Sequence, residues 1–341
     1  MMRRSAMNTV MVLSISAVTA AAVLLSFLPA CGGAAGPEEE GIDRRQEMRQ
    51  LVTDIAEYSR GLSPGFIIVL QNGQELLTED GEPEGPLCQP YASSIDGQGR
   101  EDLYFGYDED DVPTPPDETD WMVSFLDLAE QNGVEVLVTD YCWTTQHVDS
   151  SYAWNQSRGY TSFAADSRDL DRIPAYPPQP WNHDGDPVTA LSEAGNFLYL
   201  IDDGQYSSVS EFVGQLSATD YDLFILDLFC CGESLDRDDL ALLGVKPNGQ
   251  PRLVLCYVSI GEAEDYRWYW DPEWETDPPS WLGPENPQWP GNYLVEYWDP
   301  EWAAILYGSD SSYVDMVVTA GFDGVYLDKI DSFEDYEQAT F

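Results

Sequence analysis

Carboxylate residues stand beside several apolar runs of this chain. They are Asp328 after Val325-Tyr326-Leu327, Asp140 and Asp227 at the ends of two further runs, Glu262, Glu264 and Asp265 after Val258-Ser259-Ile260, and Glu101 and Asp102 before Leu103-Tyr104-Phe105. Paired carboxylates can hydrolyse a glycosidic bond, because one acts as an acid and the other as a nucleophile or base. Because 62 of the 341 residues are acidic, composition alone accounts for some of these positions.

The sequence contains few residues that could carry out other catalytic chemistries. His147 and His183 are the two histidines, and neither follows a clear strand. The sequence contains no HExxH, P-loop, GxSxG or CxxC motif. The acidic run from Asp108 to Asp111 lacks the glycine and the spacing of a calcium-binding loop. We therefore predict neither a metal nor a cofactor.

The carboxylates need elements that hold them together, and the chain alternates helical and strand patterns. Strands are predicted at 66–70, 103–105, 134–138, 160–164, 197–201, 223–229, 253–258 and 325–327, and helices at 42–60, 121–129, 147–158, 209–216, 235–243 and 302–319. Such alternation indicates a parallel sheet, and eight units close a (β/α)₈ TIM barrel with its active site at the carboxyl ends of the strands. An open doubly wound sheet is the alternative, but no glycine fingerprint for a dinucleotide follows a strand.

The first residues carry the pattern of an export signal. Arg3 and Arg4 precede an apolar stretch from Met11 to Leu28, which ends in Leu28-Pro29-Ala30-Cys31. A positive start, an apolar centre and small residues at the cut are typical of a secretory signal. Cys31 at the cut predicts lipidation. We therefore expect a lipoprotein signal peptide at 1–31, a tether at 32–41 and the barrel at 42–341, lipid-anchored to a bacterial membrane or cell surface.

The charge excludes one class of partner. The net charge is −47, and Lys246 and Lys329 are the only lysines. Nucleic-acid binding needs clustered basic residues, so nucleic acid is excluded as a partner. Strong acidity suits either high salt or a cationic substrate.

The cysteines and tryptophans leave alternatives open. Five cysteines follow Cys31, of which Cys88 and Cys142 are the expected pair if a disulfide forms, while Cys256 lies in an apolar run and is expected to be buried. Seven of the eleven tryptophans fall between Trp268 and Trp302. They could form platforms for sugar rings or a small core of their own.

Several long motifs resemble one known family. They are Tyr257-Val258-Ser259-Ile260-Gly261-Glu262-Ala263-Glu264-Asp265-Tyr266-Arg267, Trp281-Leu282-Gly283-Pro284-Glu285-Asn286-Pro287, Trp289-Pro290-Gly291-Asn292-Tyr293, Gly321-Phe322-Asp323-Gly324-Val325-Tyr326-Leu327-Asp328 and Gln71-Asn72-Gly73-Gln74-Glu75-Leu76-Leu77. Together they resemble the endo-α-1,4-polygalactosaminidase family, glycoside hydrolase family 114. The similarity is to its bacterial and archaeal branch, once labelled as cysteinyl-tRNA-synthetase-related extracellular proteins.

The resemblance implies which residues act on the substrate. It places the catalytic carboxylates at Asp328 and Glu101. We expect Asp328 to be the nucleophile and to stay ionised, and Glu101 to be the acid/base with the higher pKa. The remaining matches imply substrate-binding roles for Asp227, Asp140, Tyr257, Glu264, Asp265, Arg267, Asn72 and Trp289. The sequence departs from the family's motifs at two places. Tyr326-Leu327-Asp328-Lys329 stands where the family has Asp-Pro-Asp-Asn, and the segment that begins with Glu101-Asp102 only half matches the family's Glu-Glu-Cys-Phe.

The motifs also come in an unusual order. In the family the Gln-Asn-Gly segment follows the fourth-strand aspartate, whereas here Gln71-Asn72-Gly73 comes first. The resemblance therefore implies a circularly permuted barrel. A permuted barrel predicts that the strand of Phe66 pairs with the strands of Val325 and Leu103.

These observations predict an exported glycoside hydrolase that cleaves a polysaccharide, with galactosamine as one candidate sugar. The alternative is a surface lipoprotein that binds glycan without cutting it, which needs no carboxylate pair. A transfer-RNA-related activity follows from the old label alone, and the export signal and the acidity argue against it.

Overall fold

The computed structural model describes residues 41–338, so the predicted signal peptide, Cys31 and most of the tether lie outside it. Among the described residues, no helix is sufficiently long and apolar to cross a membrane. The strands are β1 (Ile67–Gln71), β2 (Gly97–Glu101), β3 (Glu135–Tyr141), β4 (Thr161–Ala165), β5 (Phe197–Leu200), β6 (Leu223–Leu226), β7 (Phe229–Cys230), β8 (Glu233–Ser234), β9 (Leu253–Ser259), β10 (Glu262–Glu264), β11 (Leu282–Glu285), β12 (Asn292–Val295) and β13 (Gly324–Asp328). The helices are α1 (Arg44–Leu62), α2 (Gln89–Ala92), α3 (Pro116–Gln131), α4 (Thr145–Arg158), α5 (Val209–Ser217), α6 (Arg237–Leu243), α7 (Pro300–Leu306), α8 (Tyr313–Ala320) and α9 (Ser332–Gln338), with short 3₁₀ turns η1 (Gln74–Leu77), η2 (Leu191–Glu193) and η3 (Pro272–Glu275).

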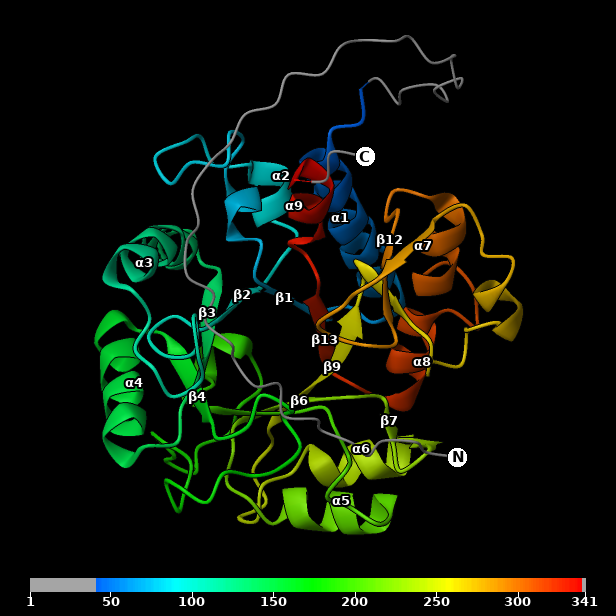
Figure 1. Ribbon diagram of the computed structural model, residues 1–341. Coiled ribbons are helices and arrows are strands. Elements are labelled where there is room, and N and C mark those ends of the chain that lie inside the picture. Colours follow the sequence, from blue (N-terminus) through cyan, green and yellow to red (C-terminus); the bar gives the residue numbers. More distant parts are fainter. Residues whose placement is uncertain (1–40, 339–341) are drawn as a thin grey trace, which may run out of the picture. The chain divides into compact units, whose positions relative to one another are not determined.

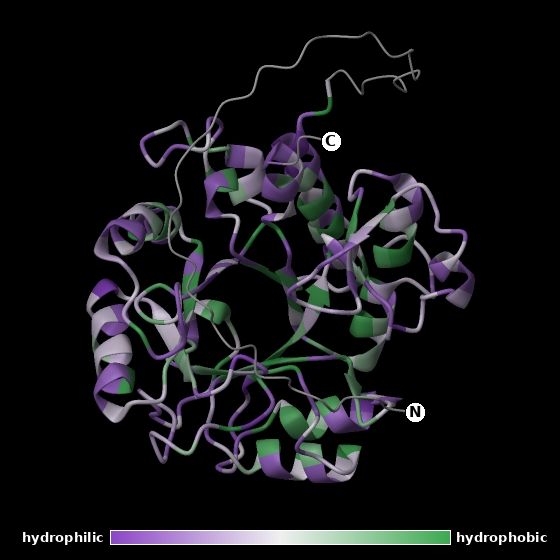
Figure 2. Cartoon of the chain, viewed as in Figure 1, coloured by the Kyte–Doolittle hydropathy of each residue, from purple (hydrophilic) through white to green (hydrophobic). Residues whose placement is uncertain are grey.

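Eight parallel strands form a nearly closed barrel, and helices surround it (Figure 1). The strand order is β4-β3-β2-β1-β13-β9-β6-β5. β4 and β5 also lie next to each other, but no ladder joins them in the described residues. The predicted (β/α)₈ architecture is confirmed. Strands β6 and β9 are buried throughout, as apolar runs in a parallel sheet should be. Figure 2 shows hydrophobic residues along barrel strands and hydrophilic residues along many connecting loops.

One predicted strand was placed wrongly. The strand next to β1 is Gly97–Glu101, and Leu103–Phe105 lies in the loop that follows. The β2 sequence has no apolar run, because it has glycines at positions where side chains of other elements fill the barrel interior. A Cβ at Gly99 would meet the Tyr326 hydroxyl and lie 2.7 Å from the carbonyl oxygen of Leu70. Glu101 therefore ends its strand, at the edge where a barrel carries its active site.

Two other elements differ from the pattern prediction. The expected helix 302–319 is two helices, α7 and α8, separated by residues 307–312, where Gly308 has a φ of 104°. The tryptophan-rich loop contains a small antiparallel sheet in the order β10-β12-β11. Trp281 and Trp302 are buried in the main hydrophobic core, whereas Trp268 and Trp289 are exposed. The expected separate core does not form: the buried tryptophans of this region extend the main core, and the others lie at the surface.

The two ends of the described chain meet beside β1. β1 pairs with β13 through Ile67 and Gly324, so the pairing predicted between the strands of Phe66 and Val325 is confirmed. α1 packs against α8 and α9, and Arg45 forms an ion pair with Glu337 at 2.8 Å. α1 thus takes the place of the barrel helix that would join β13 to β1. This arrangement fits the permuted order predicted from the motifs.

Candidate active site

Glu101 lies at the carboxyl end of β2 and receives hydrogen bonds from both neighbouring strands. From the β1 side, the Gln71 side-chain amide donates to Oε2 at 2.6 Å and the Asn72 amide donates to the same oxygen at 3.4 Å. From the end of β3, the Tyr141 hydroxyl donates a short hydrogen bond to Oε1. The Gln71 amide oxygen in turn accepts from the Tyr199 hydroxyl at 2.7 Å, inside the barrel. Glu101 is thus fixed in orientation by groups from the two neighbouring strands.

Asp328 lies at the carboxyl end of β13 and is held by two donors. The Tyr257 hydroxyl, from the neighbouring strand β9, donates to Oδ2 at 2.6 Å. The backbone N–H of Lys329 donates to Oδ1 at 2.6 Å. Both oxygens are engaged, which orients the carboxyl group at the barrel mouth.

The pKa values of both carboxyl groups are raised, and the charge of Glu101 contributes to the rise at Asp328. Burial raises the pKa of Asp328 to about 7, and the negative charge of Glu101 adds to this rise. Burial also raises the pKa of Glu101, and the charge of the adjacent Asp102 adds to it. We expected Asp328 to stay ionised, but its raised pKa means that it titrates near neutral pH.

Arg267 joins two of the predicted site residues. It lies 2.7 Å from Asp227 and 2.5 Å from Glu264, and its own side chain is almost fully buried. Glu264 also accepts a short hydrogen bond from Tyr266. These three charged residues therefore form an ion-paired cluster at the ends of β6 and β10, in which one arginine contacts two carboxylates. Glu264 is not a free acid that could substitute for Glu101.

Asp140 points into the barrel wall rather than its mouth. One of its oxygens accepts from the backbone N–H groups of Tyr104 and Phe105 at 2.8 and 3.2 Å. The other accepts from Ser151 at 2.6 Å and Asn155 at 3.3 Å, both on α4. Asp140 is fully buried. It therefore supports the loop after Glu101, and its predicted contact with substrate does not fit this geometry.

The remaining predicted residues lie around the rim. Asn72 contacts Glu101 twice, because its Oδ1 also accepts from the Glu101 backbone N–H at 3.3 Å. Asp265 is exposed, and its backbone N–H donates to the Gly291 carbonyl at 2.8 Å. Trp289 is 49% exposed on the loop beside β12. Asp265 and Trp289 thus face solvent.

Four residues that contact Glu101 directly or through a neighbour were not found from the sequence: Tyr141, Gln71, Tyr199 and Arg168. The Arg168 guanidinium lies 3.8 Å above the Tyr141 ring and 2.8 Å from Asp102. Alternation along a strand could have revealed Tyr141, because Asp140 and Tyr141 must point to opposite faces. Asp140 faces α4, so Tyr141 faces the barrel interior.

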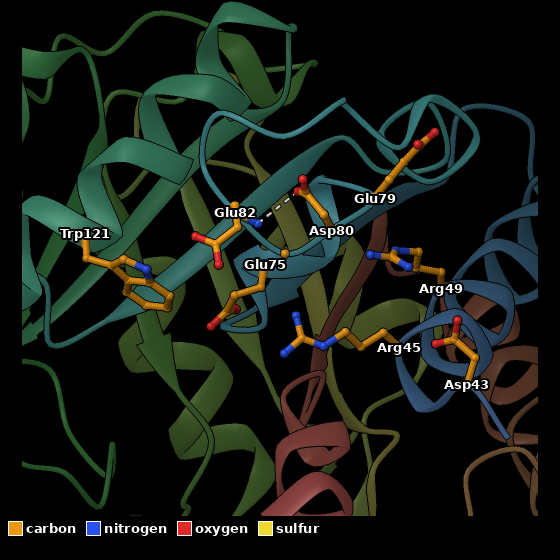
Figure 3. Close-up of a pocket in the computed structure, with 9 residues that line it drawn as sticks. Asp43, Arg45, Arg49, Glu75, Glu79, Asp80, Glu82 and Trp121 are labelled. Atoms are coloured by element: carbon orange, nitrogen blue, oxygen red, sulfur yellow. Dashed lines mark hydrogen bonds between the residues drawn. The ribbon is translucent and has the colours of Figure 1, made fainter. Parts of the chain in front are cut away.

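A charged hollow of about 380 Å³ opens beside α1 and η1, outside the Glu101–Asp328 pair (Figure 3). Arg45, Arg49, Glu75 and Trp121 are among the residues that line it. The charge of Glu75 and burial together raise the pKa of Glu334, on α9, to about 7, with burial the larger cause. This hollow is a polar recess on the rim and does not contain the carboxylate pair.

The cysteines of the described residues are all free thiols, so the expected Cys88–Cys142 disulfide is absent there. Cys256 is buried, as predicted. Cys230 and Cys231 lie together with Asp203, as described below.

Comparison with known proteins connects this geometry to one family. A segment of 148 residues, 43% of the chain, is 57% identical to an uncharacterized protein of Methanocaldococcus jannaschii. Shorter segments are 55% identical over 84 residues to an uncharacterized protein of Thermotoga maritima and 44% identical over 93 residues to one of Deinococcus radiodurans, or 25% and 27% of the chain. These matches span 40%, 25% and 29% of the length of the three relatives.

Residues 239–340 match the sequence profile of glycoside-hydrolase family GH114. The matched segment runs from α6 to the end of α9 and includes Tyr257, Glu264, Arg267 and Asp328. It therefore contains one carboxylate of the pair, the tyrosine that holds it and the neighbouring ion cluster. This match, over about 30% of the chain, supports membership of glycoside-hydrolase family GH114.

Proposed function

We propose that the chain is an exported glycoside hydrolase that cleaves a polysaccharide with Glu101 and Asp328. The observation that supports this most is the presence of two partly buried, hydrogen-bonded carboxyl groups at strand ends, whose pKa values are both raised. Glycoside hydrolysis needs such a pair, with one group holding a proton near the working pH.

The contacts of Asp328 and Glu101 support different catalytic roles for the two carboxyl groups. Asp328 receives hydrogen bonds from Tyr257 and from the Lys329 backbone, which favour its ionised form. Glu101 stands next to Asp102, whose negative charge favours a proton on Glu101. In the proposed retaining scheme, Asp328 attacks the anomeric carbon while Glu101 donates its proton to the leaving oxygen. Glu101 then takes a proton from the water that releases the sugar from Asp328.

The exposed aromatic residues suit a carbohydrate substrate. Trp268, Tyr266 and Trp289 are 43%, 57% and 49% exposed, and two of them flank the cluster around Arg267. Aromatic faces can cover the apolar faces of sugar rings. The net charge of −47 would attract a cationic polymer, so an amino-sugar polysaccharide, such as one that contains galactosamine, is the substrate to test first.

We also propose that Cys31 carries a lipid that anchors the protein to a bacterial membrane or cell surface. The small residues around Cys31 after an apolar stretch support this proposal. Cys31→Ser should abolish lipid labelling and release the protein from the membrane fraction. Unchanged fractionation and unchanged mass would rule out the anchor.

The test of the activity is a set of isosteric variants on a panel of polysaccharides. Asp328→Asn and Glu101→Gln should each lose hydrolysis by about three orders of magnitude or more while keeping the fold. Glu109→Gln, the same exchange at an exposed loop residue, should keep full activity. NMR of the first product anomer would distinguish retention from inversion. If both site variants hydrolyse like the parent, the two-carboxylate scheme is wrong and a glycan-binding role takes its place.

A further inference from the structure

Two consecutive cysteines and an aspartate come together on the rim of the barrel. Cys230 and Cys231 belong to the β7–β8 hairpin that follows β6, and Asp203 lies in the loop after β5. The two Sγ atoms are 3.4 Å apart. The two sulfur atoms and a carboxylate oxygen all lie within 4.8 Å of one another. Neighbouring parallel strands thus bring three potential ligands of one cation to the same point.

The backbone explains why both thiols face the same way. Consecutive side chains of an extended strand point to opposite faces. Cys231 departs from that geometry with a φ of 56°, in the left-handed region that residues with a side chain seldom adopt. The Cys231 N–H also donates a short hydrogen bond to the Asp203 carboxylate, which holds this acid against the thiols. The strained conformation therefore serves to assemble the three groups.

A disulfide between the two cysteines is disfavoured by chain geometry. The peptide bond between them is trans, and consecutive Cα atoms across such a bond are about 3.8 Å apart. Disulfides usually need Cα atoms at least about 4.4 Å apart. The cysteines are accordingly suited to remain a dithiol, whose two sulfur atoms are free to bind something else.

We propose that Cys230, Cys231 and Asp203 bind a borderline-soft divalent cation, with Zn²⁺ as the first candidate. Two thiolates and one carboxylate are ligands that Zn²⁺ accepts, and water would complete a tetrahedral set. With Zn–S bonds of about 2.3 Å, a tetrahedral site places two sulfur atoms about 3.7 Å apart, so the present pair must open by only a few tenths of an ångström. Binding releases two thiol protons to solvent and involves no oxidation or reduction.

The cation would join two loops next to the candidate active site. The Phe229 backbone N–H donates to Asp227 at 2.8 Å, and Asp227 is paired with Arg267. Cys230 is 2% exposed, whereas Cys231 is partly exposed and leaves an entry path from solvent. The proposed role is a clamp that fixes the hairpin and the loop after β5. It is separate from the hydrolytic step and does not depend on it.

The test is a titration of the reduced full chain with Co²⁺ without oxygen, followed by competition with Zn²⁺. Co²⁺ should bind once per chain and give the sulfur-to-metal charge-transfer absorption of a thiolate site. Cys230→Ser and Cys231→Ser should each weaken binding by about a hundredfold, and Asp203→Asn by about tenfold. Zn²⁺ should raise the Tm of the parent protein but not of the two cysteine variants.

Matched controls separate this site from other thiols and acids. Cys88→Ser removes a free thiol elsewhere, and Asp202→Asn removes the neighbouring carboxylate, so both should bind Co²⁺ like the parent. Circular dichroism verifies that each variant is folded. Absence of the charge-transfer band overturns the proposal, as does an equal loss in Cys88→Ser. A mass lower by two hydrogens in the isolated chain, mapped to residues 230–231, would also overturn it in favour of a disulfide.

Discussion

Replacing Asp328 with asparagine should make the protein more stable at neutral and alkaline pH. Burial raises the pKa of Asp328 from 3.8 to about 7 in the folded protein. A carboxyl group with a raised folded pKa favours folding below its unfolded pKa, and this contribution disappears as the pH rises through the folded pKa. Asparagine does not ionise, so Asp328→Asn keeps that contribution at every pH.

The size of the effect follows from the shift in pKa. A difference of about 3 units corresponds to about 4 kcal/mol, at about 1.36 kcal/mol per unit. Asp328 is partly exposed at the barrel mouth, and screening by water reduces the effect to about 2–4 kcal/mol. Asparagine preserves two contacts if its oxygen accepts from Lys329 and its amide donates to the Tyr257 oxygen. We therefore expect the variant to match the parent near pH 4 and to exceed it by this amount at pH 8.

Urea unfolding at several pH values between 4 and 8, followed by tryptophan fluorescence, measures this difference without any substrate. Asp108→Asn, at an exposed residue, removes the same unit of charge and controls for the general effect of a net charge of −47. A stability difference between Asp328→Asn and the parent that does not change with pH would refute the reasoning. A difference that shrinks toward pH 8 would refute it as well.

Three further predictions concern neighbouring residues. Tyr141→Phe removes a hydrogen-bond donor that lowers the pKa of Glu101, so the limb of the kcat/KM–pH profile that reports Glu101 should move up by about 1–2 pH units. An unchanged profile would show that Tyr141 does not act on Glu101. Arg267→Met leaves Asp227 and Glu264 without their countercharge and should destabilise the fold by about 3–5 kcal/mol in urea unfolding, whereas Arg237→Met at the surface should change stability little. Gly99→Ala should lower the free energy of unfolding by about 2–4 kcal/mol, because the added Cβ meets Tyr326. Gly214→Ala in α5, where no atom lies within 4 Å of the added Cβ, should be neutral or stabilising, and equal effects of the two changes would contradict the packing argument.

The strands that could be predicted from the sequence are those whose residues are apolar on both faces. Leu253 to Val258 and Leu223 to Leu226 carry this pattern without interruption. β2 could not be predicted, because its interior space is filled by Tyr326 from another strand and the strand itself contains Gly97 and Gly99. The local sequence pattern of a strand does not indicate that a side chain from another strand fills the space beside it.

The same distinction applies to the candidate site. Asp328 and Glu101 were identified from motifs, and the structure places both at strand ends. The donors that hold Glu101, Gln71 and Tyr141, come from strands on either side, so their roles depend on strand order and on the face to which each side chain points. Asp140 was misjudged because a carboxylate at a strand end can turn outward and brace a loop as readily as it can face the barrel mouth.

The ladder between β1 and β13 has a kinetic consequence. Its partners Ile67 and Gly324 are far apart in the chain, and β13 is the last of the eight barrel strands to leave the ribosome. Until then, β1 presents an unpaired edge to any other strand nearby, which is a risk for aggregation. Barrel closure has to wait until β13 has emerged, and pairing across such a long sequence separation is slow. Folding intermediates of this protein should therefore depend on chaperones that bind exposed strand edges until β13 has been synthesised.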